Sequence, residues 1–520
     1  MTQHERKPVI LVCPEISYAF PFSFGYLAGY LKQVGEDVRI LFRPPFPGQY
    51  KQLVKQILDL NPILVGFGSL YPDLRPTREL IGMLDQAKRQ FPIVIGGQMV
   101  SPIPEFALQI TGADFGVIGE EEIILHDLVV ALRENKDLQS VRGLAIRERD
   151  KVVLTGPGPF IKDLSKLPPI PYELFPEDKF VPIGRFYTSR GDAHWHYNDR
   201  VVSIHGGRGC PYRCNFCYHH SQMRYRAISD MIREAEDLIP RYNANVLYFG
   251  DDLVFATPQR VREMTDSLRQ LTRQLNRRVG YSVQTRFDAL ERIDDDLLYE
   301  MKETACRVVG LGIESGSQRI LDIMNKRITV DQIKSGLARL KQVGIVPTVS
   351  IMVGQLTETR EDVEASIALM RESVRNDKNI QYGFTITTPY PGSPLYTLAL
   401  EKGYLRDHQD FYDRCGTLGS FNNLTVNFSE MSDEEVITLR GRLWQIYLEE
   451  KKRALGWKAW TVESARGFLE RWDRRLNNRI FSKFPSHGLT QTAVRIYKKT
   501  YDSVQLVLDT WRLHLRGICN

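Results

Sequence analysis

The sequence predicts an α/β protein with two consecutive series of parallel strands and helices, followed by a helical C-terminal region. Short runs rich in β-branched residues alternate with helical patterns from residue 9 to about residue 135. A second alternating series spans residues 201–388, and after Tyr396 long helical patterns replace the strand signals. A chain of 520 residues has room for about three domains.

The first series contains the candidate strands VILVC, DVRILF, ILVGFG, IVIGG and DFGVIG. Several of them end in glycine, which would let a ligand approach the backbone closely at the carboxyl edge of a doubly wound sheet. Residues 1–142 are therefore expected to form a Rossmann-like domain. A hairpin, GLAIRERDKVVLTG, and the proline-rich stretch LSKLPPIPYELFP follow, and they predict a connecting segment over residues 143–195.

The second series begins at VVSIHGG and continues through VLYFGDD, VGYSVQ, VVGLGIE, IVPTVSIMVG and IQYGFTITT. Six βα units predict a partial barrel over residues 196–400, with its ligand site at the carboxyl ends of the strands. Residues 401–520 are expected to form a basic, tryptophan-rich helical region.

Composition places the chain among intracellular globular proteins. It is 42% hydrophobic and 25% charged, and no run approaches about 18 uninterrupted apolar residues. The N-terminus lacks the pattern of a signal peptide, so a cytoplasmic location is expected. Three of the seven cysteines fall within eight residues, which indicates a metal site in a reducing compartment.

The cysteine cluster, Cys210, Cys214 and Cys217, directly follows the first strand of the predicted barrel. Three thiolates on a short loop can hold one 4Fe-4S cluster. A zinc site, with His219 or His220 as the fourth ligand, is the alternative. A cluster with three cysteines leaves one iron open for the amine and carboxylate of S-adenosylmethionine. The spacing, with Phe216 just before the third cysteine, resembles the radical SAM superfamily, whose catalytic loop carries these residues.

That resemblance assigns S-adenosylmethionine contacts to residues at the ends of successive strands. A short acidic turn after the second barrel strand would meet the methionyl amine, and the ends of the third and fourth strands would bind ribose and carboxylate. The residues at these places are Gly250, Asp251 and Asp252, then Gln284 and Arg286, then Glu314 and Ser315.

The first domain, through GGQMVSPIPEFALQITGADFGVIGEEE, resembles the cobalamin-binding domain of cobalamin-dependent radical SAM enzymes, in which TPYPGSPLY, residues 388–396, also recurs. The resemblance implies that cobalamin is approached by Phe67, Gly68, Ser69, Leu70, Tyr71, Gly96, Gly97, Gln98, Gly119 and Glu120. The domain lacks an Asp-x-His-x-x-Gly loop, and its histidines are His4 and His126. A Rossmann domain that binds a nucleotide, or nothing, is the alternative.

Both cofactors together imply reductive cleavage of S-adenosylmethionine to a 5′-deoxyadenosyl radical and methyl transfer through methylcobalamin to an unactivated carbon. Reduced flavodoxin or ferredoxin would be the electron donor. One alternative is an oxidative cyclase or rearrangement enzyme that resembles the anaerobic tetrapyrrole cyclase. Another is a non-catalytic cobalamin-binding or iron-sulfur regulator.

The C-terminal region carries 17 Lys and Arg against 7 Asp and Glu over residues 440–520, and five of the six tryptophans. One interpretation is a helical cap on the barrel, with Trp and Leu inward. The other is a peripheral membrane contact, which would suit a lipid substrate, whereas no nucleic-acid module accompanies the charge. Cys415 is a candidate hydrogen donor or acceptor for the active site.

Overall fold

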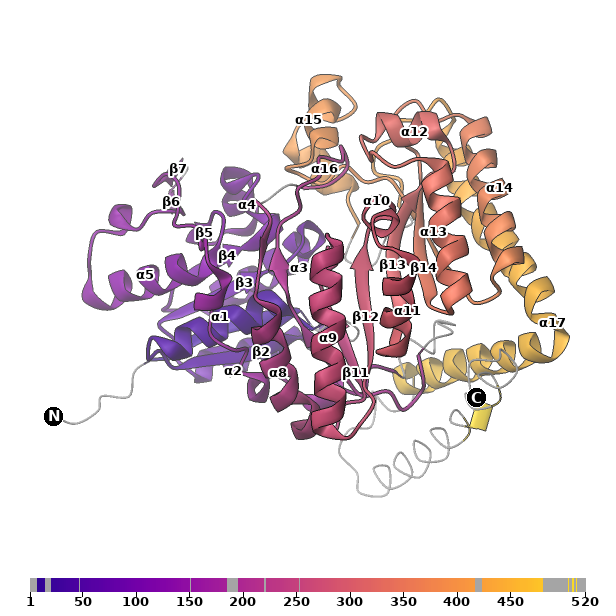
Figure 1. The fold of residues 1–520 in the computed structure, drawn as a ribbon. Coiled ribbons are helices and arrows are strands. Elements are labelled where there is room, and N and C mark those ends of the chain that lie inside the picture. Colours follow the sequence, from indigo (N-terminus) through magenta and orange to yellow (C-terminus); the bar gives the residue numbers. More distant parts are fainter. Residues whose placement is uncertain are drawn as a thin grey trace.

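The computed structural model describes residues 7–14, 20–45, 47–149, 151–184, 195–218, 221–251, 253–416 and 423–479, and positions 504, 507, 508 and 511. The N-terminal and central α/β units stand side by side, and the long helix α17 lies on the far side of the central unit (Figure 1). Asp252, His219 and His220 lie outside the described residues.

The N-terminal sheet has the strand order β2-β1-β3-β4-β5-β6-β7. Strands β1 to β5 are parallel, as the sequence predicts, and the hairpin β6–β7 extends the sheet with antiparallel pairing to β5. Helices α1 and α5 contact each other, and α3 contacts both α2 and α4, as in a doubly wound sheet. The elements are β1 (Val9–Pro14), α1 (Phe22–Gln33), β2 (Val38–Arg43), α2 (Tyr50–Asp59), β3 (Leu64–Gly68), α3 (Leu74–Gln86), β4 (Ile93–Gly96), α4 (Pro104–Thr111), β5 (Phe115–Val117), α5 (Glu121–Glu134), β6 (Leu144–Glu148) and β7 (Lys151–Leu154).

The second sheet has six parallel strands in the order β15-β14-β13-β12-β11-β8. Its two edge strands are not paired with each other, so the predicted partial barrel is confirmed as an open one. The strands are β8 (Val201–Ile204), β11 (Val246–Phe249), β12 (Gly280–Thr285), β13 (Cys306–Glu314), β14 (Val346–Val353) and β15 (Gln381–Ile386). The helices are α8 (Ile228–Arg241), α9 (Pro258–Leu275), α10 (Phe287–Glu291), α11 (Asp295–Glu303), α12 (Gln318–Ile323), α13 (Val330–Val343) and α14 (Arg360–Asn376).

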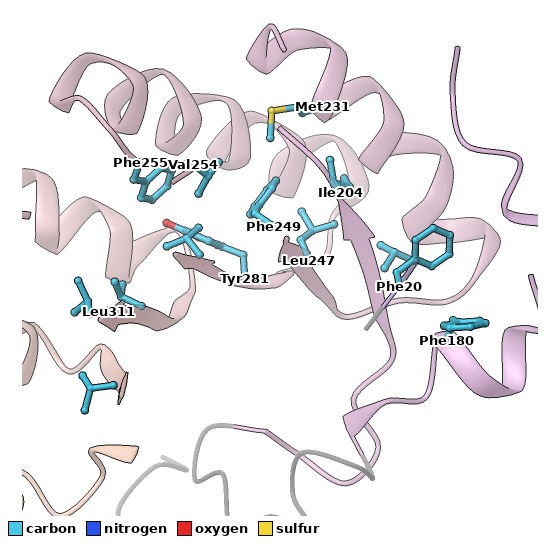
Figure 2. Close-up of a cluster of buried hydrophobic side chains, with 14 of the residues drawn as sticks. Phe20, Phe180, Ile204, Met231, Leu247, Phe249, Val254, Phe255, Tyr281 and Leu311 are labelled. Atoms are coloured by element: carbon cyan, nitrogen blue, oxygen red, sulfur yellow. The ribbon is translucent and has the colours of Figure 1, made fainter. Parts of the chain in front are cut away.

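Local sequence fixes the ends of these helices. Thr329 and Gln332 form a capping box at the start of α13, and Gly344 ends that helix in the left-handed region with φ 73°. Pro258 occupies the first turn of α9, where it removes no helical hydrogen bond. Apolar side chains from the strands and from the helices that cover them fill the layer between the sheet and these helices, for example Leu247, Phe249 and Tyr281 (Figure 2).

The predicted connecting segment packs against both units. A Cβ on Gly29 of α1 would lie 2.8 Å from the carbonyl oxygen of Pro169. Tyr172 stacks on Phe20 with ring centroids 4.5 Å apart, and its hydroxyl donates to the carbonyl oxygen of Ser203 in β8. The segment therefore fastens the N-terminal sheet to the first barrel strand.

The C-terminal helices divide into two groups. Helices α15 (Pro394–Glu401) and α16 (His408–Arg414) pack with residues of the N-terminal unit, whereas α17 (Asp433–Arg479) contacts α14 and β15. Gly456 interrupts α17 with φ 76° and ψ 164°. The cap interpretation fits the docked part of α17. The expectation that the tryptophans face inward is wrong for Trp444, Trp457 and Trp511, whose side chains are 40%, 72% and 60% exposed.

Candidate active site

The cysteine loop follows a short strand, β9 (Gly207–Arg208), which pairs antiparallel with β10 (Arg224–Tyr225). Along the loop, Cys210 is partly buried, Cys214 is buried and Cys217 is exposed. Among the residues that the structure describes, no three His, Cys, Asp or Glu side chains form a site for a single metal ion.

The start of the cysteine loop is held by Asp251, which follows β11. Its carboxylate accepts hydrogen bonds from the backbone N–H groups of Gly206, at 2.8 and 2.7 Å, and Gly207, at 2.7 Å. His205 Nε2 lies 3.4 Å from the same carboxylate. Asp251 therefore fixes the chain that leads into the cysteine loop, a role different from the amine contact that the resemblance implies for it.

The middle of the cysteine loop is held by backbone contacts to two other segments. The N–H and the side-chain amide of Asn215 donate to Met324 and Ile323, at 3.0 and 2.9 Å. The carbonyl oxygen of Asn215 accepts from Leu395 N–H at 2.9 Å. Leu395 belongs to TPYPGSPLY, so this motif positions the cysteine loop.

The same motif contacts Tyr218, the residue after the third cysteine. Gly392 has φ 89°, and a Cβ there would lie 2.3 Å from Cδ2 of Tyr218 and 3.0 Å from Pro102. A hydrogen bond also joins Tyr218 to Ser101. Tyr218 thus lies between the motif and the N-terminal domain, and the lack of a side chain at position 392 makes room for it.

Arg286 and Gln284, the two residues expected to contact S-adenosylmethionine at the end of the third barrel strand, lie in different surroundings. The Arg286 guanidinium lies 3.7 Å from the Cys214 sulfur, stacks over the Tyr212 ring at 3.6 Å and donates to Asp288 at 2.9 Å. Gln284 donates to the Tyr248 hydroxyl at 3.1 Å inside the barrel.

The fourth strand ends in a buried ion pair. Glu314 has φ 65° beside a register shift in β13, and its carboxylate accepts from Lys326 at 2.8 Å and from Ser350 at 3.0 Å. The Lys326 ammonium also lies 5.7 Å from the Phe216 ring centroid. Ser315 is fully buried and accepts from the N–H of Ser317 at 3.1 Å. The Glu314–Lys326 pair, rather than Ser315, therefore places polar groups near the cysteine loop.

A cavity of about 550 Å³ separates the cysteine loop from the carboxyl edge of the N-terminal sheet. Residues from both α/β units line it, and Gly209 and Tyr218 on its wall flank the cysteines. The residues expected at cobalamin or S-adenosylmethionine that line it are Phe67, Gly68, Ser69, Leu70, Gly96, Gly97, Gln98, Gly119, Glu120, Gly250 and Asp251. Tyr71 is instead buried against Phe411 of α16, with ring centroids 4.9 Å apart.

Ion pairs across this cavity join the two units. Glu120 pairs with Arg224 and accepts from Ile161 N–H at 3.0 Å, and Glu122 pairs with Arg208. These contacts hold the pKa of Glu120 below its usual range against the opposing effect of burial. Arg208 stands two residues before Cys210, so the pairs connect the start of α5 to the cysteine loop.

Sequence reasoning missed three residues of this region. Glu121 lines the cavity, Lys326 pairs with Glu314, and Tyr218 packs against the TPYPGSPLY motif. The run GEEE after β5 could have indicated that more than one carboxylate reaches the sheet edge. Cys415 is buried, and burial raises its pKa to about 12, so it keeps its S–H group; its role as a hydrogen donor or acceptor stays a prediction.

Comparison with known proteins matches two family models to the chain. Residues 17–129 match the B12 binding domain, and residues 204–370 match the radical SAM superfamily. The second range contains the cysteine loop.

Two curated relatives cover most of the chain. An uncharacterised methyltransferase of Pyrococcus horikoshii is 28% identical over 395 residues, which is 74% of this chain and 79% of the relative. The anaerobic magnesium-protoporphyrin IX monomethyl ester cyclase of Rubrivivax gelatinosus is 27% identical over 385 residues, or 72% of this chain and 65% of the cyclase.

Among solved structures, the radical S-adenosylmethionine methyltransferase TsrM of Kitasatospora setae, with cobalamin and a [4Fe-4S] cluster bound, has the same fold. Its TM-score is 0.62 at 17% identity, over 86% of this chain and 89% of TsrM. The chain therefore contains a B12-binding domain at residues 17–129 and a radical SAM domain at residues 204–370, and it is an enzyme whose cofactors are a [4Fe-4S] cluster, S-adenosylmethionine and cobalamin.

Proposed function

We propose that this enzyme is a methyltransferase that adds a methyl group to an unactivated carbon of a small-molecule or lipid substrate. Cys210, Cys214 and Cys217 would hold the [4Fe-4S] cluster. The supporting observation is that one cavity is lined both by the strand ends of the B12-binding domain and by residues that flank the cysteine loop. A shared cavity would bring a methyl carrier and a radical source to the same substrate atom.

The chemistry of the donor set fits the cluster. Three thiols lie on one loop, and the Arg286 guanidinium lies 3.7 Å from the Cys214 sulfur, where it would offset negative charge on a bound cluster. When bound, the reduced cluster supplies the electron that splits S-adenosylmethionine, and cobalamin supplies the carrier of the methyl group. The buried Lys326–Glu314 pair offers an ammonium and a carboxylate to the polar methionyl end.

The protein's own contribution would be positioning and the exclusion of water. Asp251, Asn215 and Tyr218 hold the cysteine loop, and Phe20, Phe22 and Phe24 give the cavity an apolar wall. An unactivated C–H bond develops little charge as it breaks, so fixed dipoles could accelerate that step only slightly. A dry, rigid cavity would instead protect reactive species from solvent.

Loss of the cluster ligands tests the first part of the proposal. Anaerobically reconstituted Cys210→Ala, Cys214→Ala and Cys217→Ala proteins should form no 5′-deoxyadenosine with dithionite as reductant, while the wild type forms it. Cys306→Ala, which removes a buried thiol at the start of β13, is the matched control and should retain the activity. Equal 5′-deoxyadenosine formation by the loop variants would refute the ligand assignment.

The fate of the methyl group tests the second part. Cells that express the protein with deuterated methyl-methionine should accumulate a product that carries the labelled methyl, together with S-adenosylhomocysteine. A product that gains a ring or an oxygen atom and no label would favour the cyclase alternative, which the Rubrivivax gelatinosus relative suggests. A protein that forms neither S-adenosylhomocysteine nor 5′-deoxyadenosine would be a regulator.

Lipid contact through α17 is a second proposal. None of the helices among the described residues combines the length and apolar composition needed to span a bilayer. Trp457 is nevertheless 72% exposed next to Lys458 on α17, a pairing suited to an anionic membrane surface. The full chain should sediment with phosphatidylglycerol vesicles and lose much of that binding in Trp457→Ser. No sedimentation of the wild type would refute the proposal.

A further inference from the structure

Glu121 stands where the carboxyl edge of the N-terminal sheet meets the cavity. It is the first residue of α5, which begins after a short turn that follows β5, and it lines the cavity with Gly97, Gln98 and Ser69. A Cβ on Gly96 would lie 2.3 Å from Glu121 Oε1. The glycine at the end of β4 therefore leaves the room that this carboxyl group occupies.

The two neighbouring glutamates each form an ion pair with an arginine. Glu120 pairs with Arg224, and Glu122 pairs with Arg208. Glu121 accepts a hydrogen bond from the backbone N–H of Gly97, and Glu122 lies near enough to repel its negative charge. Of the three consecutive glutamates, Glu121 is thus the one that lines the cavity without an ion pair to an arginine of the described residues.

Burial, and then the nearby Glu122 charge, raise the pKa of Glu121 to about 7. Arg208 acts in the opposite direction. The carboxyl group is therefore largely neutral below pH 7, and a neutral carboxyl group has both an O–H donor and a carbonyl acceptor.

We propose that neutral Glu121 binds one of the primary amide side chains of the corrin ring, donating to the amide oxygen and accepting from the amide nitrogen. The inference rests on the proposed cobalamin site in this cavity. A primary amide presents the same donor–acceptor pair in mirror order, so the two groups can form two parallel hydrogen bonds. Glu121, rather than Glu120, becomes the specificity residue at the end of β5.

Cobalamin affinity should then fall as the pH rises through the pKa of Glu121. If only the neutral form binds, and the pKa is about 7, the dissociation constant should rise about tenfold between pH 6 and pH 8. The other titratable and charged groups among the described residues that line the cavity are Cys13, Tyr26, Glu120, Glu122, His205, Arg208, Tyr218 and Asp251. The Glu121 variants separate its titration from theirs.

The experiment measures hydroxocobalamin binding to the full-length, anaerobically reconstituted protein by equilibrium dialysis at pH 6, 7 and 8. Glu121→Gln keeps a donor and an acceptor without a charge, so it should bind with the wild-type affinity of pH 6 and lose the tenfold dependence that Glu121 causes. Glu121→Ala should bind about tenfold more weakly at pH 6. Asp127→Asn, an exposed position on the same helix, should bind as the wild type does.

The outcomes separate the inference from the proposed function. A wild type that binds no hydroxocobalamin at any pH would overturn both the cobalamin site and the role of Glu121. A wild type that binds, with Glu121→Gln retaining the full pH dependence, would overturn the inference alone. Far-ultraviolet circular dichroism of each variant reports the fold, and Glu121→Gln, which is nearly isosteric, decides the matter if Glu121→Ala does not fold.

Discussion

A methyl group added at position 392 tests whether the TPYPGSPLY motif positions the cysteine loop. In Gly392→Ala, the new Cβ would lie 2.3 Å from Cδ2 and 2.5 Å from Cε2 of Tyr218, so the ring must move. The backbone, at φ 89°, would also be strained by any side chain. The substitution therefore combines backbone strain with displacement of the residue after Cys217.

Gly403→Ala separates these two effects. Gly403 also has a positive φ, 73°, but no atom lies within 4 Å of a Cβ built there, so its substitution carries strain alone. Overpacking typically costs about 1–3 kcal/mol, and we take about 2 kcal/mol for the Tyr218 contact. At roughly 2–4 °C per kcal/mol for a folding unit of this size, Gly392→Ala should melt about 4–8 °C below Gly403→Ala.

The assay is thermal unfolding of the two variants, followed by iron and sulfide analysis after anaerobic reconstitution. Gly392→Ala should also retain less iron per chain than Gly403→Ala, because Tyr218 adjoins Cys217. Equal melting temperatures and equal iron contents would show that Tyr218 can move freely, and the positioning role of the motif would be refuted.

Three further predictions concern charged groups. Arg286→Met should lower the iron retained after desalting, because it removes the cation beside Cys214, and retention equal to that of the wild type would contradict this role. Arg208→Met and Glu122→Gln should show a coupling energy of about 1–3 kcal/mol in a double-mutant cycle from urea unfolding, since the pair is largely buried, and purely additive effects would refute it. Burial raises the pKa of Glu358 from 4.5 to about 7, so the folded state binds the extra proton and stability should fall as the pH rises across that range. In urea titrations, the free energy of unfolding should fall less between pH 5 and pH 8 for Glu358→Gln than for the wild type. An equal fall would contradict the raised pKa of Glu358.

The strands could be predicted because each is a short β-branched run with clear boundaries, and the parallel order follows from the helices between them. Residues such as Phe67 and Gly97 could be placed at the sheet edge because they end strands. Arg286 was expected at the ribose or carboxylate of S-adenosylmethionine, but its distance from Cys214 depends on the path of a loop 72 residues earlier in the chain. Periodicity carries no information on such a contact.

The separate roles of neighbouring residues of one type are harder still to predict from sequence. Glu120, Glu121 and Glu122 are chemically identical in the sequence, and their side chains separate only where α5 begins. Two of them meet arginines from β9 and β10, which lie more than eighty residues away along the chain. The outward tryptophans of α17 are a related case, since an amphipathic pattern shows that a helix has two faces but not how much of its length finds a partner.

The proline-rich segment between the two α/β units also limits how the enzyme can be divided into fragments. Pro169 lies against Gly29 of α1, and Phe175 and Phe180 complete an aromatic cluster around Phe20. A separately expressed B12-binding fragment would have to extend through Phe180 to keep this cluster closed. A cut after the hairpin would expose aromatic side chains to water and invite aggregation of the fragment.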